Sequence, residues 1–120
     1  MSVIHPIEVE SYRILESRVD LSHLAPLSRA VVARIVHASA DLEYARTTVL
    51  DEAALAAAVG AIRQGAPIVT DVEMVAAGIT GVEALCYLDA AVASRERTRS
   101  AAAMRLAVEH HLRGAIFAIG

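Results

Sequence analysis

The chain of 120 residues contains no lysine and no tryptophan, one cysteine, and only 3% aromatic residues. All eleven basic residues are therefore arginines, which, with an alanine-rich apolar set, we attribute to the composition of the source genome. The single cysteine, Cys86, excludes an intrachain disulfide, and its apolar neighbours favour a structural role in a reducing compartment. A formal net charge of −3 excludes a general attraction to the phosphate backbone of nucleic acids.

Long hydrophobic runs and secretion signals are also missing. No stretch of about 18 apolar residues occurs, and residues 53–61 are too short and too rich in alanine to span a bilayer. Residues 1–10 have neither the basic region nor the apolar core of a signal peptide. With 56% hydrophobic and 21% charged residues, the chain has the composition of one folded domain, and we expect a soluble, cytoplasmic protein.

A histidine interrupts the apolar helical pattern of residues 31–44. Val32, Ile35 and Val36 recur at helical spacing, and His37 follows them beside three small residues that leave room for a ligand. Imidazole exchanges a proton near neutral pH, so His37 is a candidate catalytic residue. A partly buried structural histidine has the same pattern, and the spacing alone leaves both interpretations open.

The other helices of the first half are marked by their ends. Pro6 favours the start of a first helix, with an apolar face that includes Ile7, Ile14 and Leu15 and with Ser11 as an ordinary surface residue. Residues 20–26 break the helical pattern.

Two residues are expected to cap the helices that follow. We expect Ser28 to be the N-cap of the helix that carries His37 and Asp51 to be the N-cap of a third helix. Gly65 is expected to end that third helix, because glycine favours the conformation at a helix C-terminus.

Strands and helices alternate in the second half. Residues 66–71, 84–88 and 115–119 are short apolar runs typical of strands, the last of them typical of a buried parallel strand. Helices are expected over residues 72–77 and 101–112. This order predicts an α/β fold, with a parallel sheet and flanking helices in three layers, in a single domain over residues 1–120. The chain stops directly after the third strand, so we expect the fold to be truncated there.

Two groups of polar residues are candidates for ligand contacts. Asp71 follows a strand end, where ligands bind in open α/β sheets, although it is equally suited to a helix N-cap. Arg99 stands between Thr98 and Ser100 at a helix start, which is a suitable anion site. The same polar run, residues 94–100, is also typical of a solvated loop.

Two adjacent histidines close the last expected helix. His110 and His111 point to different helix faces and lack the i, i+4 spacing of a metal-binding pair. We interpret them as surface or helix-end residues and expect no metal site.

Four sequence blocks stand out along the chain: RIVHASAD around His37, QGAPIVTDVEMVAAGIT from Gln64, TRSAAAM from Thr98, and GAIFAIG at the end of the chain. Together they resemble the precorrin-8X methylmutase family. Their order and approximate spacing match, and the resemblance covers essentially all of this chain. It covers a little over half of a typical family member, whose pattern continues with an Asn-Ala-Pro-Thr turn, another helix and a glycine-rich region.

The resemblance implies an isomerase of cobalamin (corrin) biosynthesis. Such an enzyme moves a methyl group between adjacent ring carbons of precorrin-8X to give hydrogenobyrinic acid, or converts cobalt-precorrin-8 to cobyrinic acid. It needs no cofactor, takes a tetrapyrrole as its substrate and forms a homodimer. The alternative is a truncated, inactive fragment that binds a tetrapyrrole or a partner chain.

The resemblance also implies roles for particular residues. His37 matches the catalytic histidine of the family and would act as a general acid, in agreement with the chemistry of imidazole. Arg99 matches the arginine of the TRSAA block and would pair with a substrate carboxylate. The other implied polar contacts to the macrocycle are Ser11, Thr98, Ser100 and Asp71.

Overall fold

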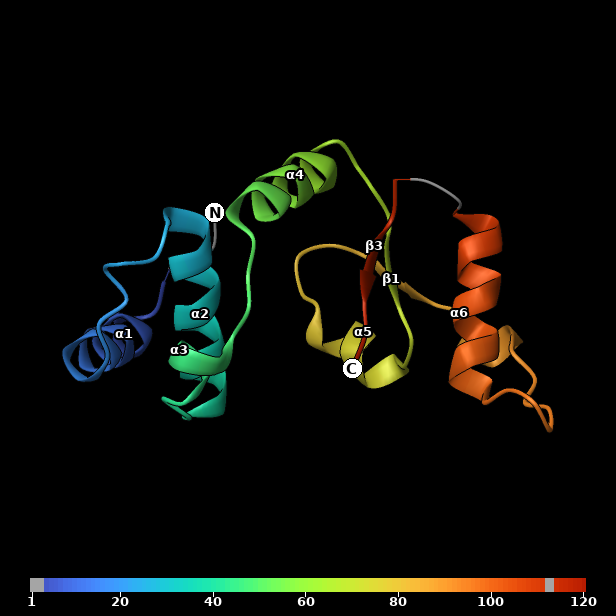
Figure 1. Cartoon of the computed structure of the whole chain (residues 1–120), viewed down its shortest axis with the longest axis horizontal. Helices are drawn as coiled ribbons and strands as arrows, with labels where there is room; N and C mark the ends of the chain where they lie inside the picture. The colour runs from blue at the N-terminus through green and yellow to red at the C-terminus, as the bar shows by residue number, and fades with distance from the viewer. Residues whose placement is uncertain (1–3, 112–113) are drawn as a thin grey trace. The chain divides into compact units, whose positions relative to one another are not determined.

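The computed structural model describes residues 4–111 and 114–120 (Figure 1). The chain consists of two compact units, Met1–Ala57 and Ala58–Gly120. That these form one domain stays a prediction. Within the described residues, no helix is both long enough and apolar enough to cross a membrane.

The expected alternation of helices and strands is confirmed. The first half holds α1 (Pro6–Arg18), α2 (Pro26–Ser39), the short α3 (Tyr44–Thr47) and α4 (Glu52–Arg63). The second half holds β1 (Ile68–Thr70), α5 (Glu73–Gly78), β2 (Ala84–Cys86), the 3-10 helix η1 (Leu88–Ala90), α6 (Arg99–His110) and β3 (Ile116–Ala118). The structure adds α3 and η1, which the pattern did not predict.

The core of the first unit lies between α1 and α2. Leu15, Leu21, Val32 and Val36 form its buried cluster. The apolar face expected for α1 is only partly buried, because Ile7 is 74% and Ile14 is 42% exposed. Among the described residues of this unit, α1 packs chiefly against α2, and one neighbouring helix covers only a narrow stripe of its surface.

The start of α2 differs from the expectation, and Ser28 is not its N-cap. The helix begins three residues earlier than expected, at Pro26, after the N-cap residue Ala25, whose side chain cannot accept a hydrogen bond. The carboxylate of Glu52 takes over this role, accepting the backbone N–H groups of Leu27 and Ser28, both at 2.8 Å, and the Ser28 hydroxyl at 2.7 Å. A carboxylate is favourable at this position because the N-terminus of a helix carries partial positive charge.

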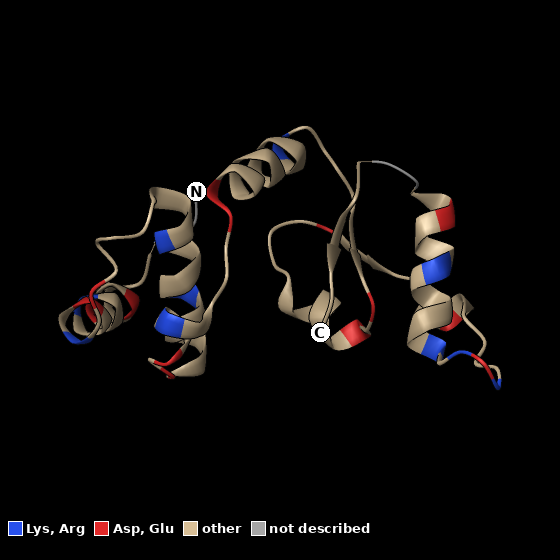
Figure 2. Cartoon of the chain, in the orientation of Figure 1, with Lys and Arg blue, Asp and Glu red and all other residues tan. Residues whose placement is uncertain are grey.

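The ends of α4 agree with the sequence. Asp51 Oδ1 accepts the backbone N–H of Ala54 at 3.0 Å, which confirms Asp51 as the capping residue. Gly65 follows the helix with a φ of +85°, a conformation that glycine adopts without steric cost. Figure 2 shows charge only at the two ends of this helix, where Glu52 and Arg63 stand.

The second unit is built on a parallel sheet with the strand order β2-β1-β3. Ile68 is in register with Ala84 on one side and Ile116 on the other. The central strand β1 is buried throughout. By contrast, β3 is not the buried strand that its sequence predicts: it lies at the edge of the described sheet, and Phe117 is 39% exposed. Parallel pairing and flanking helices confirm the predicted α/β fold class (Figure 1).

Helix α6 begins two residues before its expected start. The side chain of Thr98 accepts the backbone N–H of Ala101 at 3.2 Å and so caps the helix. Ala103 and Ala107 form its buried face. Its C-terminal end carries His110 and His111, as expected, and the expected last residue, Leu112, lies outside the described residues.

Candidate functional site

His37 is held by side chains of the neighbouring helix α1. It lies in the last turn of α2, where it is half-buried. Its Nδ1 is 3.1 Å from Ser11 Oγ, and the ring of Tyr12 stacks on its imidazole, with 4.6 Å between the ring centroids and 13° between the planes. The hydrogen bond and the stack act on one ring from two directions, so they fix the plane and the rotation of the imidazole.

Tyr12 is itself anchored by a charged pair. Arg34 donates from Nη1 to the Tyr12 hydroxyl at 3.2 Å and to Glu8 Oε1 at 2.8 Å. The hydrogen bonds to Tyr12 and Glu8 raise the pKa of Arg34 above its ordinary value, so this guanidinium stays charged. The four side chains Glu8, Arg34, Tyr12 and His37 therefore form one continuous chain of contacts between α1 and α2.

A groove of about 260 Å³ opens beside His37. Its apolar lining comes from both helices and the turn after α2: Ile14, Leu15, Val36, Ala40 and Leu42. Its polar lining consists of Ser11, His37 and Arg18. Ala40 ends α2 in the left-handed conformation, with a φ of 56°, and its small side chain borders the groove. A group that can exchange a proton therefore faces a mostly apolar hollow.

The other predicted site residues belong to the second unit. Arg99 donates from Nε to the Leu88 carbonyl at 2.9 Å and from Nη2 to Asp89 Oδ1 at 3.5 Å. These bonds hold the guanidinium beside the segment that follows β2, and the described residues place no partner on Nη1. Ser100 is half-buried in the first turn of α6, and the hydroxyl oxygen of Thr98 is engaged in capping that helix.

Asp71 has a structural partner that neither interpretation of the sequence included. It is only 8% exposed, and its Oδ1 accepts the backbone N–H of Gly120 at 3.1 Å. Its interpretation as a helix N-cap is wrong, because Val72 precedes α5 and no side chain caps that helix. The carboxylate instead ties the segment after β1 to the segment after β3, at the carboxyl edge of the sheet where a ligand crevice is expected.

The structure therefore brings together two of the six predicted site residues, Ser11 and His37, by a direct contact. A second hollow, of about 310 Å³, lies at the amino ends of β1 and β2, and Glu83 is its only ionisable lining residue. Compared with the groove at His37, this hollow offers fewer side chains that could act on a ligand. In residues 4–111 and 114–120, no three His, Cys, Asp or Glu side chains are placed to hold a metal ion.

Two residues of the site were missed from the sequence. Tyr12 supplies the stacked ring, and Arg18 is part of the groove lining. The signal for Arg18 was its position seven residues after Ser11, which places both side chains on the same face of a helix. For Tyr12 no signal existed, because a stack between two helices is a tertiary contact.

The protein is therefore an α/β protein with a parallel sheet and flanking helices. It carries a candidate acid–base residue, a histidine held beside a groove between two helices. The sequence pattern of the precorrin-8X methylmutase family matches residues 6–120. The chain therefore belongs to the precorrin-8X methylmutase family.

Individual relatives agree with this assignment. The chain is 40% identical to the cobalt-precorrin-8 methylmutase of Methanothermobacter thermautotrophicus, an alignment that covers 81% of this chain and 49% of the relative. It is 36% identical to the precorrin-8X methylmutase of a Sinorhizobium species, over 92% of this chain and 57% of the relative. The chain thus spans about half the length of these curated relatives.

A solved structure shows the same fold. The precorrin-8X methylmutase of Thermus thermophilus superimposes with a TM-score of 0.80 at 34% sequence identity. That match covers 95% of this chain and 61% of the other. A structure described as a precorrin-8X methylmutase related protein matches with a TM-score of 0.76 at 26% identity, over 91% of this chain and 62% of the other.

Proposed function

We propose that this chain takes part in cobalamin biosynthesis as a methylmutase. Its substrate is precorrin-8X or cobalt-precorrin-8, and the reaction moves a methyl group between adjacent ring carbons to give hydrogenobyrinic acid or cobyrinic acid. One observation carries the proposal: in a member of this family, a histidine oriented by two neighbours faces an apolar groove. The names of the relatives include both the cobalt-free and the cobalt-containing substrate.

In the proposed mechanism His37 is a general acid. Its Nδ1 is engaged by Ser11, so Nε2 is the nitrogen available to the macrocycle. When the imidazole is protonated, the Ser11 hydroxyl oxygen accepts a hydrogen bond from Nδ1–H, because a hydroxyl can either donate or accept a hydrogen bond. Nε2 then protonates, or donates a hydrogen bond to, a ring position as charge develops during the methyl shift.

The residues of the second unit are proposed to bind the polar periphery of the substrate. Arg99 pairs through its remaining N–H groups with a carboxylate, which a guanidinium binds with favourable geometry. Thr98, Ser100 and Asp71 are the further polar contacts. The buried bond from Asp71 to Gly120 gives its carboxylate a second role, the positioning of the segment after β3.

The remaining parts of the proposal concern the protein as a whole. It works without a cofactor, as a homodimer in the cytoplasm, and without nucleic-acid or membrane partners. The family match and the absence of a membrane-spanning helix from the described residues are consistent with this location.

Turnover by this 120-residue chain tests the proposal. We expect the native chain to convert precorrin-8X to a product with the absorption spectrum of hydrogenobyrinic acid. We expect His37→Gln to slow conversion at least about 100-fold, the contribution typical of a general acid, while still binding hydrogenobyrinic acid. Native-like turnover by this variant would contradict the role of His37.

The alternative function makes a different prediction in the same experiment. A tetrapyrrole-binding fragment shifts the spectrum of hydrogenobyrinic acid but converts no precorrin-8X. A chain that neither binds nor converts would contradict tetrapyrrole chemistry for this polypeptide.

A further inference from the structure

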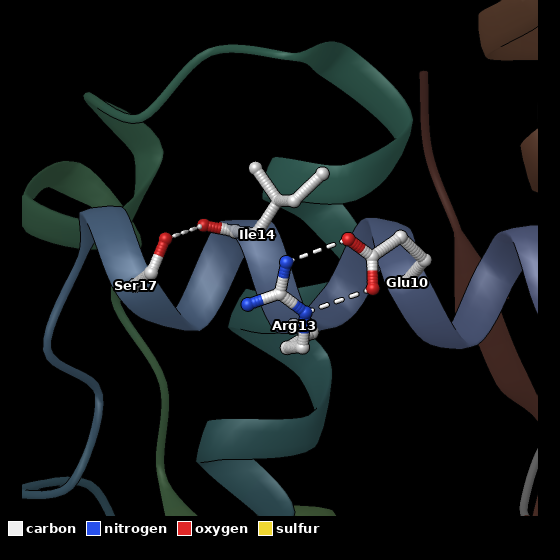
Figure 3. Close-up of polar contacts among 4 residues, drawn as sticks. All are labelled: Glu10, Arg13, Ile14 and Ser17. Atoms are coloured by element: carbon white, nitrogen blue, oxygen red, sulfur yellow. Dashed lines mark hydrogen bonds and ion pairs between the residues drawn. The ribbon is translucent and has the colours of Figure 1, made fainter.

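Arg18 differs from every other arginine of the first unit. Arg13 pairs with Glu10 through two hydrogen bonds of 2.8 and 2.6 Å, which Figure 3 shows as a fork between the two side chains. The remaining arginines of the unit are also engaged: Arg29 by two backbone carbonyls, Arg34 by Glu8 and Tyr12, and Arg46 by Glu43. Among the described residues, Arg18 alone in this unit has no such partner.

Arg18 is one of the residues that line the groove of His37. Ser11, Ile14, Leu15 and Arg18 are spaced i, i+3, i+4 and i+7 along α1 and line the same groove. Seven residues of an α-helix correspond to about 10 Å along its axis. Ser11, which contacts His37, and Arg18 therefore stand about 10 Å apart along the axis of α1, and apolar lining residues lie between them.

No carboxylate of the described residues competes for this cation. The lining contains no Asp or Glu. The two acids that flank Leu42 in the chain are engaged elsewhere: Asp41 accepts the backbone N–H of Glu43 at 2.9 Å, and Glu43 pairs with Arg46. An arginine with all its donors available beside an apolar surface is suited to a carboxylate on an otherwise apolar ligand.

We infer that Arg18 binds a carboxylate arm of the tetrapyrrole while His37 faces the macrocycle from the other end of the groove. The inference rests on the proposed function and goes beyond it by adding a specificity residue. A bidentate bond from guanidinium to carboxylate fixes both the position and the direction of the arm. Arg18 therefore selects the acidic periphery of the substrate and sets its rotation relative to His37.

A binding titration with matched variants tests this role. Hydrogenobyrinic acid is titrated into the native chain, Arg18→Gln, Arg18→Lys and the control Arg63→Gln, and its absorption spectrum is followed. Arg63 is exposed in α4 and makes no hydrogen bond or ion pair among the described residues, so its variant removes the same charge away from the groove. We expect Arg18→Gln to raise Kd about tenfold, the loss typical of one charge-assisted hydrogen-bond pair.

The control variants sharpen the expected result. Arg63→Gln is expected to bind like the native chain, and Arg18→Lys to lie between native and Arg18→Gln, because lysine keeps the charge but loses the fork. The difference in Kd between Arg18→Gln and the native chain should become smaller as salt is raised. Salt screens the attraction between Arg18 and the carboxylate, which only the native chain has.

Each other outcome overturns the inference in a recognisable way. If Arg18→Gln binds like the native chain while His37→Gln has altered binding or turnover, Arg18 is not a substrate contact and the proposed function stands. If Arg18→Gln and Arg63→Gln weaken binding equally, the effect is one of net charge only. If Arg18→Gln changes only stability, its role is to complement the dipole of α1. If the native chain binds nothing, both the inference and the proposed function fail.

Discussion

His37 shows how a side chain of ordinary sequence context becomes a candidate catalyst. The pattern around it places the residue near the end of a helix but leaves its ring free to rotate. The hydrogen bond of Ser11 and the stacked ring of Tyr12 remove that freedom. Preorganisation of this kind matters because a general acid must meet the substrate atom within hydrogen-bonding distance.

At the residue scale we predict that Tyr12 is a positioning residue for His37. Tyr12→Leu removes the stacked ring and is expected to lower kcat about tenfold, since an aromatic pair contributes up to about 1.5 kcal/mol. KM should change little, because Tyr12 does not line the groove. Steady-state kinetics with precorrin-8X measure both constants.

The matched variant for this prediction is Tyr12→Phe. It keeps the stack and loses only the hydrogen bond from Arg34, so kcat should fall less than in Tyr12→Leu. Equal values of kcat for the two variants would show that the ring itself does not position His37. Circular dichroism of both variants checks that the helices are intact.

At the scale of the element, side-chain hydrogen bonds hold the N-terminal ends of two helices. Helix α2, which bears His37, starts on a carboxylate supplied by α4, and α6 starts on the hydroxyl of Thr98. These bonds satisfy backbone N–H groups that have no partner within their own helix. The start of α6 also carries Arg99, so its cap helps to place a proposed substrate-binding residue.

We predict that the Thr98 cap stabilises the second unit. Thr98→Ala leaves the backbone N–H of Ala101 without its acceptor and is expected to lower the free energy of unfolding by about 1 kcal/mol. Thr98→Ser keeps the acceptor and should stay close to the native value. Urea unfolding followed by circular dichroism measures both, and equal stability of the alanine and serine variants would rule out a capping contribution.

At the scale of the whole molecule, carboxylates of the first unit link folding to pH. Hydrogen bonds lower the pKa of Glu10, Asp20 and Glu52 below their ordinary values, through Arg13, Ser22 and Ser28 respectively as the largest cause. Groups whose pKa is lower in the folded state stabilise it when they are ionised. Their contribution to stability is fully present when the pH is above the ordinary pKa values, 3.8 for Asp and 4.5 for Glu. It is lost as the pH falls through the lowered pKa values.

We therefore predict that Glu52→Gln lowers stability at pH 7 and that this effect is smaller at pH 3. At neutral pH the variant replaces a charged acceptor at the start of α2 with a weaker, neutral one. As the pH falls below 4.5 and through the lowered pKa of Glu52, the native carboxylate takes up a proton, so the stabilities of native and variant chains should approach one another. Urea unfolding at both pH values measures the difference.

The control for the pH experiment is Glu96→Gln. Glu96 is exposed and makes no hydrogen bond among the described residues, so its variant should match the native chain at both pH values. A Glu52→Gln difference that is the same at pH 7 and pH 3 would contradict the linkage.

Local sequence signals determined the fold class and many of the element ends. Pro6, Asp51 and Gly65 act through their own backbone conformation or a neighbour a few residues away, so their roles could be predicted. The same holds for the positions of the strands and their parallel direction, because short apolar runs between helices indicate parallel strands. His37 was found as a candidate because imidazole chemistry is visible in the sequence.

Tertiary structure alone decided the contacts between elements. Ser28 has the chemistry of an N-cap, but Pro26 starts the helix earlier and Glu52, 24 residues away, reaches its N-terminus. The apolar sequence of β3 does not reveal that it is an edge strand, because burial depends on which neighbours a strand acquires. The packing of α1 against α2 likewise creates the stack of Tyr12 on His37 and the groove that Arg18 lines. Both features depend on residues that are distant in the chain.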